Sequence, residues 1–393
     1  MSRSTVLVLV YPEIISGTGK TTPGMLNACL LDRGQSTLWP VLLSSMQQQL
    51  ERVCRENNAT CESWNYNSRA NNPPTIILVT VEKTVDPQFH EYVVQLVNEN
   101  RLARIIVDEA HLAVAHLFRS IMHTLIWAAS RGVQLVLQTA TMPPSIEGLI
   151  FKAFGVTTYS VVRASTTRPN ISYNVIRVAD DNEMYARCEL LIDHILHTQG
   201  HGSVLIFCKS RNIAEEFGQR NNIPFCHAKL SKPEIDTILK QLHTGKIRAV
   251  IATTLLSVSL NEASVTDVIH LDYPFDALGY IQETGRTGRD PSVLCWSYVI
   301  VVEGTPERRT SEDLLGSRLV RASIDNTSLC RRLLVWGFND GTALPCSMLQ
   351  GNVHYCDVCS RMSSLLPIRG ARINFTTEMI QQYLPNHGMS NNP

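Results

Sequence analysis

The feature that most constrains the fold is a regular alternation of short β-branched runs with longer amphipathic segments. In the first part of the chain, apolar runs lie at residues 6–10, 37–43, 75–80, 104–107 and 133–138. Helical patterns separate these runs, among them residues 45–57 and 118–130. Continuous apolar runs of this length are typical of strands that are buried on both faces of a parallel sheet. The pattern therefore predicts an α/β domain in which helices cover a parallel sheet.

A second alternating series follows a polar, proline-containing stretch at residues 164–170. Its predicted strands lie at residues 203–207, 249–252, 268–271 and 296–302. After Glu303 the strand pattern stops, and a charged helical stretch at 306–322 leads into a cysteine-containing segment that is too short for a core of its own. Given roughly 150 residues for an ordinary domain, we expect one domain at 1–164, a second at 165–305, a small subdomain at 306–370 and a tail at 371–393.

The composition is that of a globular protein, with 44% hydrophobic and 18% charged residues. Lys plus Arg and Asp plus Glu both total 35, so contact with nucleic acid must come from local basic clusters. The 11 cysteines are an odd number, which favours reduced intracellular thiols and one metal site over a disulfide framework. No apolar run reaches the roughly 18 residues that span a bilayer, so we expect no membrane anchor.

A phosphate-binding loop is predicted directly after the first apolar run. Gly17 and Gly19 would let backbone N–H groups converge on phosphate oxygens, Lys20 would add a positive charge, and the Thr21 hydroxyl would bind Mg²⁺. The predicted nucleotide-binding residues are Ser16, Gly17, Thr18, Gly19, Lys20, Thr21 and Thr22. The usual pattern has glycine where this chain has Ile14, so a chance glycine turn before a helix is the alternative.

Two adjacent carboxylates, Asp108 and Glu109, follow the apolar run at 104–107. Side chains at the carboxyl ends of parallel strands lie where open α/β folds bind ligands. We expect Asp108 to hold Mg²⁺ and Glu109 to orient the attacking water. A solvated acidic turn is the alternative for such a pair in isolation.

A further basic string contains Arg286 and Arg289, which are three residues apart. On a helical turn they would project from one face, and guanidinium groups suit the charge of a transferring phosphoryl group. A basic surface turn is the alternative.

In this order, the motifs resemble those of superfamily 2 helicases with a DEAH-type acidic motif, Asp108-Glu109-Ala110-His111, and in particular the RecQ family. The string from Gln282 to Asp290, Gln-Glu-Thr-Gly-Arg-Thr-Gly-Arg-Asp, is close to the family signature. Thr139-Ala140-Thr141 and Arg168-Pro169-Asn170 resemble further family motifs. The resemblance covers about residues 10 to 360 and implies two RecA-like domains in tandem, followed by a small helical zinc-binding subdomain.

The resemblance also assigns roles to residues of the second domain. It implies that Arg289 is an arginine finger, that Arg286 contacts the γ-phosphate, and that Gln282 senses the nucleotide. Because they belong to the second domain, they would complete a site that begins with Lys20 only when the two domains close over ATP and Mg²⁺.

Four cysteines resemble the zinc site that follows the second motor domain in RecQ proteins. They are Cys330, Cys346, Cys356 and Cys359. Thiolates in a tetrahedral array suit Zn²⁺, and the metal would supply folding energy to a segment that lacks a core. The spacing before Cys356 is longer than in the usual family form, so a redox pair or unrelated thiols are the alternatives.

The resemblance implies an ATP-dependent 3′-to-5′ DNA helicase that moves on single-stranded DNA and unwinds duplex DNA in recombination and repair, in the nucleus. It indicates no protein partner, and we expect a compact form without winged-helix or accessory domains and without the adenine-reading element before the phosphate loop. The chain departs from the family in lacking the Trp of the aromatic loop at 112–119 and in having Asn261 where the family has Asp. An RNA-stimulated ATPase of the same superfamily and a decayed copy that only binds nucleic acid are therefore alternatives.

Overall fold

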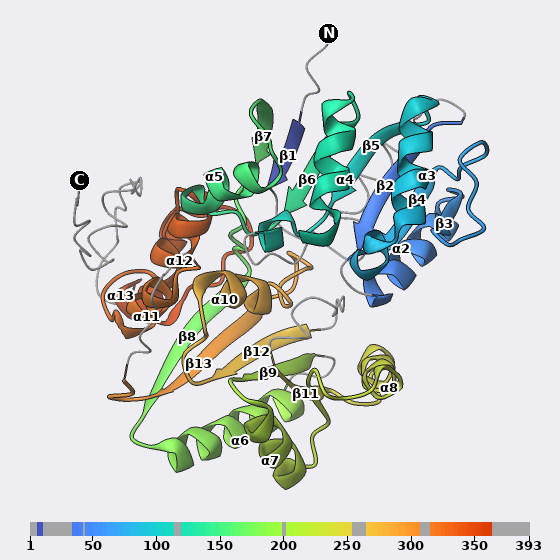
Figure 1. Cartoon of the computed structure of the whole chain (residues 1–393). Helices are drawn as coiled ribbons and strands as arrows, with labels where there is room; N and C mark the ends of the chain where they lie inside the picture. The colour runs from blue at the N-terminus through green and yellow to red at the C-terminus, as the bar shows by residue number, and fades with distance from the viewer. Residues whose placement is uncertain are drawn as a thin grey trace, which may run out of the picture. The chain divides into compact units, whose positions relative to one another are not determined.

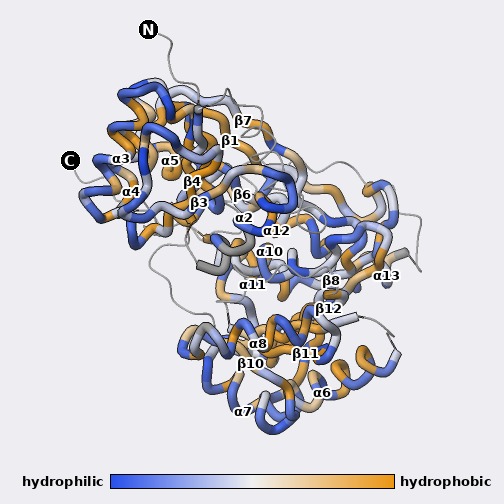
Figure 2. Tube along the Cα trace, turned by 90° about the vertical axis from the view of Figure 1, so that its right-hand side faces the viewer, coloured by the Kyte–Doolittle hydropathy of each residue, from blue (hydrophilic) through white to orange (hydrophobic). Residues whose placement is uncertain are grey.

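A computed structural model describes residues 6–10, 34–41, 44–113, 119–198, 202–253, 265–306 and 315–363. The chain divides into two compact units, Met1–Thr166 and Thr167–Pro393. In each unit the hydrophobic residues gather in the interior, where the strands lie (Figure 2). Within the described parts of the chain, no helix is long and apolar enough to cross a membrane.

The first unit is built on a seven-stranded sheet with the order β3-β4-β2-β5-β6-β1-β7 (Figure 1). All of its neighbouring strands run parallel. The strands are β1 (Val6–Val10), β2 (Ser36–Val41), β3 (Cys61–Ser63), β4 (Ile76–Thr80), β5 (Leu102–Val107), β6 (Gln134–Thr139) and β7 (Tyr159–Arg163). The helices are α2 (Ser44–Glu56), η1 (Val81–Val85), α3 (Pro87–Asn98), η2 (Ala110–Ala113), α4 (Arg119–Ser130) and α5 (Pro144–Ala153). Val8, Ile105 and Leu137 of the inner strands are completely buried, as expected for a sheet that is covered on both faces.

The second unit contains a six-stranded parallel sheet with the order β10-β11-β9-β12-β13-β8. The strands are β8 (Ile171–Val178), β9 (Ser203–Cys208), β10 (Phe225–Cys226), β11 (Ala249–Ala252), β12 (Val265–Leu271) and β13 (Cys295–Val302). The helices that accompany them are α6 (Asp181–Thr198), α7 (Arg211–Asn221), α8 (Lys232–His243) and α10 (Ala277–Thr284). On one face, Cys188, Ile192 and Ile195 of α6 pack with Ile206 and Ile269 of the sheet.

Short helices at the end of the second unit pack against its sheet and do not form a separate core. They are α11 (Ser317–Asp325), α12 (Arg331–Asp340), η3 (Cys346–Met348) and α13 (Asp357–Ser363). All residues of α12 are buried, and its Trp336 ring lies 4.6 Å from the ring of Tyr173 on β8. This segment therefore uses the edge strand β8 as the hydrophobic partner that its own length cannot provide.

The predicted fold class is confirmed: both units are parallel α/β folds. The predicted strands match β1, β2, β4, β5, β6, β9, β11, β12 and β13 within a few residues. The start of the helix predicted at 306–322 is corrected by the structure. Pro306 is not helical, and α11 begins at Ser317. Residues 307–314 lie outside the described residues. The sequence analysis also missed β3, β7, β8 and β10. The tail expected at 371–393 lies outside the described residues.

Candidate active site and cysteine cluster

The predicted acidic pair lies at the carboxyl end of β5, in the middle of the first sheet. The Asp108 carboxylate accepts a hydrogen bond from the Glu109 backbone N–H at 2.9 Å. Glu109 itself has a φ of 50°, in the left-handed region, and is 9% exposed. Holding a non-glycine residue in this region costs of order 1–3 kcal/mol, and such strain is concentrated at functional sites. The chain thus turns sharply at the point where the two carboxylates leave the sheet.

A buried histidine connects this acidic pair to the neighbouring strand β6. His111 Nδ1 lies 2.9 Å from Thr139 Oγ1 and 3.4 Å from Glu109 Oε2. The Thr139 hydroxyl donates to the Thr141 carbonyl at 3.1 Å and accepts from the Thr141 N–H at 3.0 Å. Because that hydroxyl has one proton and gives it to Thr141, Nδ1 of His111 must be the protonated nitrogen. The sequence analysis identified the Thr139 motif but gave His111 no role.

The phosphate loop predicted at Ser16, Gly17, Thr18, Gly19, Lys20, Thr21 and Thr22 lies outside the described residues. The strand that precedes it, β1, pairs with β6 so that Val10 lies opposite Thr139. The chain therefore leaves β1 at the same edge of the sheet as the acidic pair, which is the edge where open parallel sheets bind ligands.

In the second unit, α10 carries Gln282 and leads directly into the loop of the two arginines. Asp276 caps this helix by accepting a hydrogen bond from the Gly279 N–H at 2.7 Å. Gln282 is partly buried, and Arg286 and Arg289 are 6% and 5% exposed. The structure thus places the three residues predicted for the second half of the site on one helix and the loop that follows it.

The loop between the two arginines is held tightly against the sheet. The Thr287 hydroxyl is completely buried and donates to the Val265 carbonyl at 2.8 Å. Gly288 has a φ of +66°, and a Cβ at this position would lie 2.5 Å from Ile171 Cγ1. Only glycine fits here, both for its backbone angles and for the close contact with β8.

A buried hydrogen-bonded pair that the sequence analysis missed lies beside this loop. His270 Nε2, near the end of β12, is 3.0 Å from Glu283 Oε2 on α10. The His270 ring stacks on Phe207 at 5.4 Å and lies 5.2 Å from the Tyr280 ring. Glu283 belongs to the signature string, but the alternation pattern gave no sign that it faces a strand histidine.

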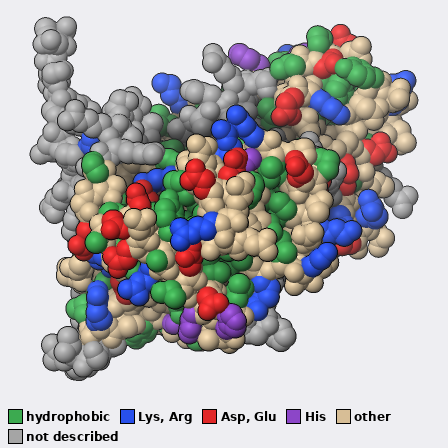
Figure 3. Space-filling model, turned by 90° about the horizontal axis from the view of Figure 1, so that it is seen from below, with side chains coloured by type: hydrophobic (Ala, Val, Ile, Leu, Met, Phe, Trp, Pro, Cys, Tyr) green, Lys and Arg blue, Asp and Glu red, His purple; other side chains and the backbone are tan. Residues whose placement is uncertain are grey.

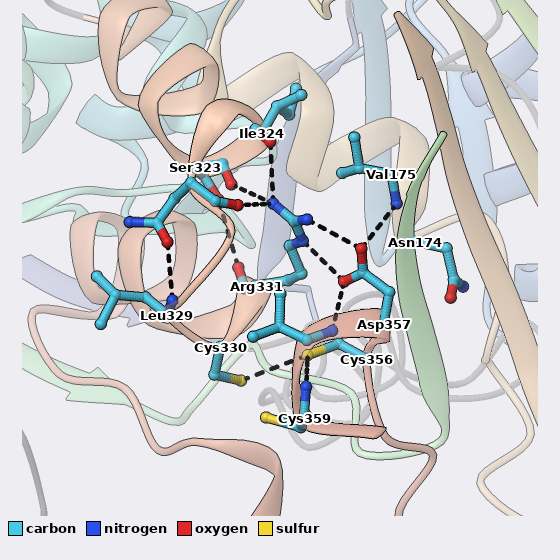
Figure 4. A network of polar contacts seen from close by, with 12 residues as sticks. Asn174, Val175, Ser323, Ile324, Leu329, Cys330, Arg331, Cys356, Asp357 and Cys359 are labelled. Atoms are coloured by element: carbon cyan, nitrogen blue, oxygen red, sulfur yellow. Dashed lines mark hydrogen bonds and ion pairs between the residues drawn. The ribbon is translucent and has the colours of Figure 1, made fainter. Parts of the chain in front are cut away.

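The four predicted cysteines come together in the second unit, and all are buried. Their sulfur atoms lie within 4.8 Å of one another. Cys330 Sγ is 3.6 Å from Cys346 Sγ. It is 3.9 Å from Cys356 Sγ (Figure 4). A tetrahedral Zn²⁺ with bonds of about 2.3 Å requires sulfur separations of about 3.8 Å, whereas a disulfide requires about 2.05 Å. The geometry therefore fits a metal-binding set and argues against unrelated thiols or a disulfide.

Hydrogen bonds favour the thiolate form at Cys346 and Cys356, whereas the pKa values of Cys330 and Cys359 are raised. Arg332 Nε donates to Cys346 Sγ at 3.3 Å, and the Cys356 N–H points to the same atom at 3.5 Å. Hydrogen bonds from the other three thiols, that of Cys330 first, hold the pKa of Cys346 far below its usual range, and the Arg332 charge lowers it further. The hydrogen bond with Cys330 lowers the pKa of Cys356 to about 7.

Sequence comparison places this arrangement among helicases. A model named helicase conserved C-terminal domain matches residues 186–291. The chain is 25% identical over 307 residues to the ATP-dependent DNA helicase RecQ of Haemophilus influenzae, covering 72% of this chain and 46% of that protein. It is 25% identical over 368 residues to the ATP-dependent helicase SGS1 of Saccharomyces cerevisiae, covering 84% of this chain and 25% of that protein. The chain thus spans less than half the length of these relatives.

Another relative and two solved structures are similar to this chain over part of its length. The ATP-dependent RNA helicase eIF4A of Eremothecium gossypii is 28% identical over 196 residues, which is 48% of each chain. The fold matches that of Mycobacterium smegmatis helicase Lhr with a TM-score of 0.58, at 19% identity, covering 82% of this chain and 46% of that one. It matches S. cerevisiae Dbp5 with a TM-score of 0.60, at 18% identity, covering 75% and 79%. In sequence the chain is similar to RecQ-type DNA helicases, and it shares the fold of its parallel sheets with these solved structures.

Proposed function

We propose that this chain is an ATP-dependent DNA helicase of RecQ type, which couples ATP hydrolysis to 3′-to-5′ movement on single-stranded DNA and to duplex unwinding in recombination and repair. The observation that carries the proposal is the buried connection from Glu109 through His111 to Thr139. It joins the predicted catalytic carboxylate to the motif that resembles the link between hydrolysis and domain movement. A nuclear location is part of the proposal and rests on the family resemblance alone.

In this proposal, the first unit binds and activates the nucleotide. Residues 16–22, with Lys20 and Thr21, would hold the phosphates, and Asp108 would help to hold Mg²⁺, which neutralises charge on the transferring phosphoryl group. Glu109 would accept a hydrogen bond from the attacking water, and His111 would fix the orientation of the Glu109 carboxylate. Because Nδ1 of His111 bonds to Thr139 and lies 3.4 Å from Glu109 Oε2, a shift of the Thr139 turn would move the imidazole beside Glu109.

The second unit would supply the positive charge. Arg286 and Arg289 would stabilise the developing negative charge on the phosphoryl oxygens, and Gln282 would sense the bound nucleotide. The cysteine cluster would hold a structural Zn²⁺, which adds folding free energy to the segment around α12. The face in Figure 3 carries intermixed acidic and basic side chains, which agrees with the balanced totals of 35 each.

An RNA-stimulated ATPase is the second candidate function. The similarity to eIF4A, and the fold that the chain shares with Dbp5 in a structure bound to RNA, favour it. The cysteine cluster and the longer match to RecQ proteins favour DNA.

The test is ATP hydrolysis by the purified chain, measured alone, with single-stranded DNA and with single-stranded RNA of the same sequence. We expect the largest stimulation with DNA, and a fall of about 10²–10⁴-fold in kcat for Glu109→Gln, as expected when a group that handles a proton is lost. Glu91→Gln, on the exposed side of α3, is the matched control and should keep wild-type activity. Greater stimulation by RNA would favour the second candidate, and activity that neither Lys20→Ala nor Glu109→Gln reduces would rule out both.

The direction of movement is tested apart from ATP hydrolysis by measuring strand separation on two duplexes. One duplex carries a 3′ single-stranded tail and the other a 5′ tail. We expect strand separation only with the 3′ tail. DNA-stimulated hydrolysis without separation of either duplex would keep the ATPase and reject the helicase.

A further inference from the structure

We infer that Arg332 and the segment 168–171 form a positioning device through which the cysteine cluster holds the loop of Arg286 and Arg289 in place. The inference rests on the proposed function, because it assigns to this loop a role in ATP hydrolysis. The sequence analysis gave Arg332 and Asn170 no role. The inference makes both of them positioning residues for the loop of Arg286 and Arg289.

Arg332 is the residue of this device that contacts the cysteine cluster. It is completely buried, although its guanidinium is charged. Its N–H groups donate to Cys346 Sγ at 3.3 Å, to the Arg168 and Pro169 carbonyls at 2.8 and 3.0 Å, and to the Ile171 carbonyl. A further bond reaches the His354 carbonyl at 3.1 Å.

The partners of Arg332 explain why its charge is tolerated without a carboxylate. The hydrogen bonds given for its guanidinium go to four carbonyls and one sulfur, and the guanidinium lies 4.8 Å over the Tyr173 ring. A buried cation needs a nearby negative charge. Four thiolates around one Zn²⁺ leave a net negative charge, so the cluster is the natural counter-charge for Arg332. Loss of the cluster would therefore remove the negative charge that stabilises the buried Arg332 guanidinium beside segment 168–171.

Segment 168–171 passes this constraint on to the arginine loop. Arg168 Nη1 donates to the Thr287 carbonyl at 2.6 Å. Asn170 Nδ2 lies 3.3 Å from the Gly288 carbonyl, 2.9 Å from that of Asp290 and 2.8 Å from that of Val293. Asn170 is 2% exposed, so water cannot readily replace these bonds. The carbonyls that Arg168 and Asn170 bind lie on both sides of Arg289.

A second connection runs from the loop before Cys356 to the same region. The His354 N–H donates to the Pro169 carbonyl at 2.9 Å, and its Nδ1 lies 3.0 Å from the Cys295 carbonyl. Asn352 Nδ2 donates to the Pro291 and Ser292 carbonyls at 3.2 Å each. The segment that supplies Cys356 therefore contacts both ends of the path from Arg332 to the arginine loop.

The device is therefore expected to affect the rate of ATP hydrolysis more than the affinity for the nucleotide. The bonds fix the backbone that carries the two guanidinium groups and not the groups themselves. A displacement of about 1 Å in catalytic geometry can cost about 10²-fold in rate. Weakening the device should therefore lower kcat and leave nucleotide binding, to which the first unit contributes most, largely intact.

The first arm of the test compares Asn170→Ala with Asn174→Ala in the full chain. Asn174 lies on β8, four residues after Asn170, and within the described parts of the chain its side chain bonds only to Ser172. We expect Asn170→Ala to keep its zinc content and to bind a fluorescent ATP analogue within about twofold of wild type, while kcat falls at least about tenfold. Asn174→Ala should match wild type in both. A folded Asn170→Ala with wild-type kcat would overturn the inference.

The second arm does not depend on activity. Hydrogen–deuterium exchange is followed in the peptide that covers residues 285–294, before and after chelation of the metal and in Arg332→Gln. We expect faster exchange in this peptide in both cases, while the β9 strand, Ser203–Cys208, stays protected. Unchanged exchange at 285–294 after metal removal would overturn the inference even in an active enzyme. Faster exchange in a chain that hydrolyses no ATP would instead reject only the proposed function.

Discussion

His111 Nδ1 lies 2.9 Å from Thr139 Oγ1, and this single hydrogen bond joins the carboxyl ends of β5 and β6. Both side chains are buried, and Thr139 has no exposed surface. Since Glu109 Oε2 is 3.4 Å from the same nitrogen, the imidazole lies between the carboxylate that we propose to be catalytic and a backbone turn at Thr141. Any movement of the Thr139 turn must then change the surroundings of Glu109.

Thr139→Val tests this coupling with almost no change of shape. It removes the acceptor that Thr139 provides to His111 and to the Thr141 N–H, at a cost of about 0.5–1.5 kcal/mol for each lost hydrogen bond. We expect stimulation of ATP hydrolysis by nucleic acid to fall more than basal hydrolysis, because the carboxylate remains but its link to the Thr139 turn is lost. Steady-state hydrolysis with and without DNA measures both.

Thr124→Val is the control for that variant. Thr124 is buried on α4, and its Oγ1 pairs at 3.3 Å with Nδ1 of the exposed His90 on α3, away from the acidic motif. Thr124→Val should lower the stability of the folded protein but keep the stimulation of ATP hydrolysis by DNA. Equal losses of stimulation in both variants would show that Thr139 acts only through stability.

Gly288→Ala tests how tightly the arginine loop is held. The backbone at this position requires positive φ, and the new methyl group would meet Ile171 Cγ1 at 2.5 Å and Asn170 Nδ2 at 3.3 Å. Gly245→Ala is a matched control, because Gly245 has a φ of +69° with nothing within 4 Å of an added Cβ. Left-handed backbone alone costs about 1–2 kcal/mol, so Gly245→Ala should lose about that much on urea unfolding. Gly288→Ala should lose more, together with most of its kcat, and identical losses would contradict the tight contact.

Substitution of Cys346, a proposed metal ligand, tests the cluster. We expect Cys346→Ser to purify without the equimolar zinc of the wild type and to be cut by protease within residues 315–363, because this segment has little core of its own. Cys226→Ser changes a thiol that is equally buried but lies in β10. It should keep its zinc and its protease resistance. Full zinc content in Cys346→Ser would remove Cys346 from the ligand set.

The fold was predictable where local pattern and tertiary environment agree. The inner strands are continuous apolar runs because both faces are covered, as at Ile105 and Leu137. The prediction failed at the edges. β7 exposes Val161 and Val162, and β8 follows Pro169 with a half-buried pattern, so neither resembles an inner strand. Edge strands are set by pairing with distant segments, which a local pattern does not contain.

The candidate site divides in the same way. Asp108 and the four cysteines could be named because their residue type carries their chemistry. Arg332 and Asn170 could not, since their partners are carbonyls up to 164 and 123 residues away along the chain. Any residue type provides a carbonyl, so such bonds leave no signal in the sequence.

The buried pair of Arg331 and Asp357 gives the last prediction. Arg331 Nε and Nη2 donate to the two Asp357 oxygens at 2.8 and 2.9 Å, while Nη1 binds the carbonyls of Ser323, Ile324 and Asn326 (Figure 4). Asp357 Oδ2 also accepts from the Val175 N–H on β8 at 3.3 Å. Asp357→Asn would leave the 5% exposed Arg331 without a counter-charge, which costs about 3–5 kcal/mol in a buried pair. We expect a loss of that size on urea unfolding.

The exposed pair of Arg52 and Glu56 on α2 is the control for this charge effect. Their side chains are 69% and 59% exposed and lie 3.3 Å apart. Such pairs contribute about 0.3–0.5 kcal/mol, so Glu56→Gln should barely shift the unfolding midpoint. Zinc content separates two outcomes for Asp357→Asn. Because Asp357 directly follows Cys356 and is the first residue of α13, we expect its loss to loosen the cluster and to reduce bound zinc. If Asp357→Asn keeps its full zinc content but loses stability as expected, the pair of Arg331 and Asp357 stabilises only the packing of α13 on β8.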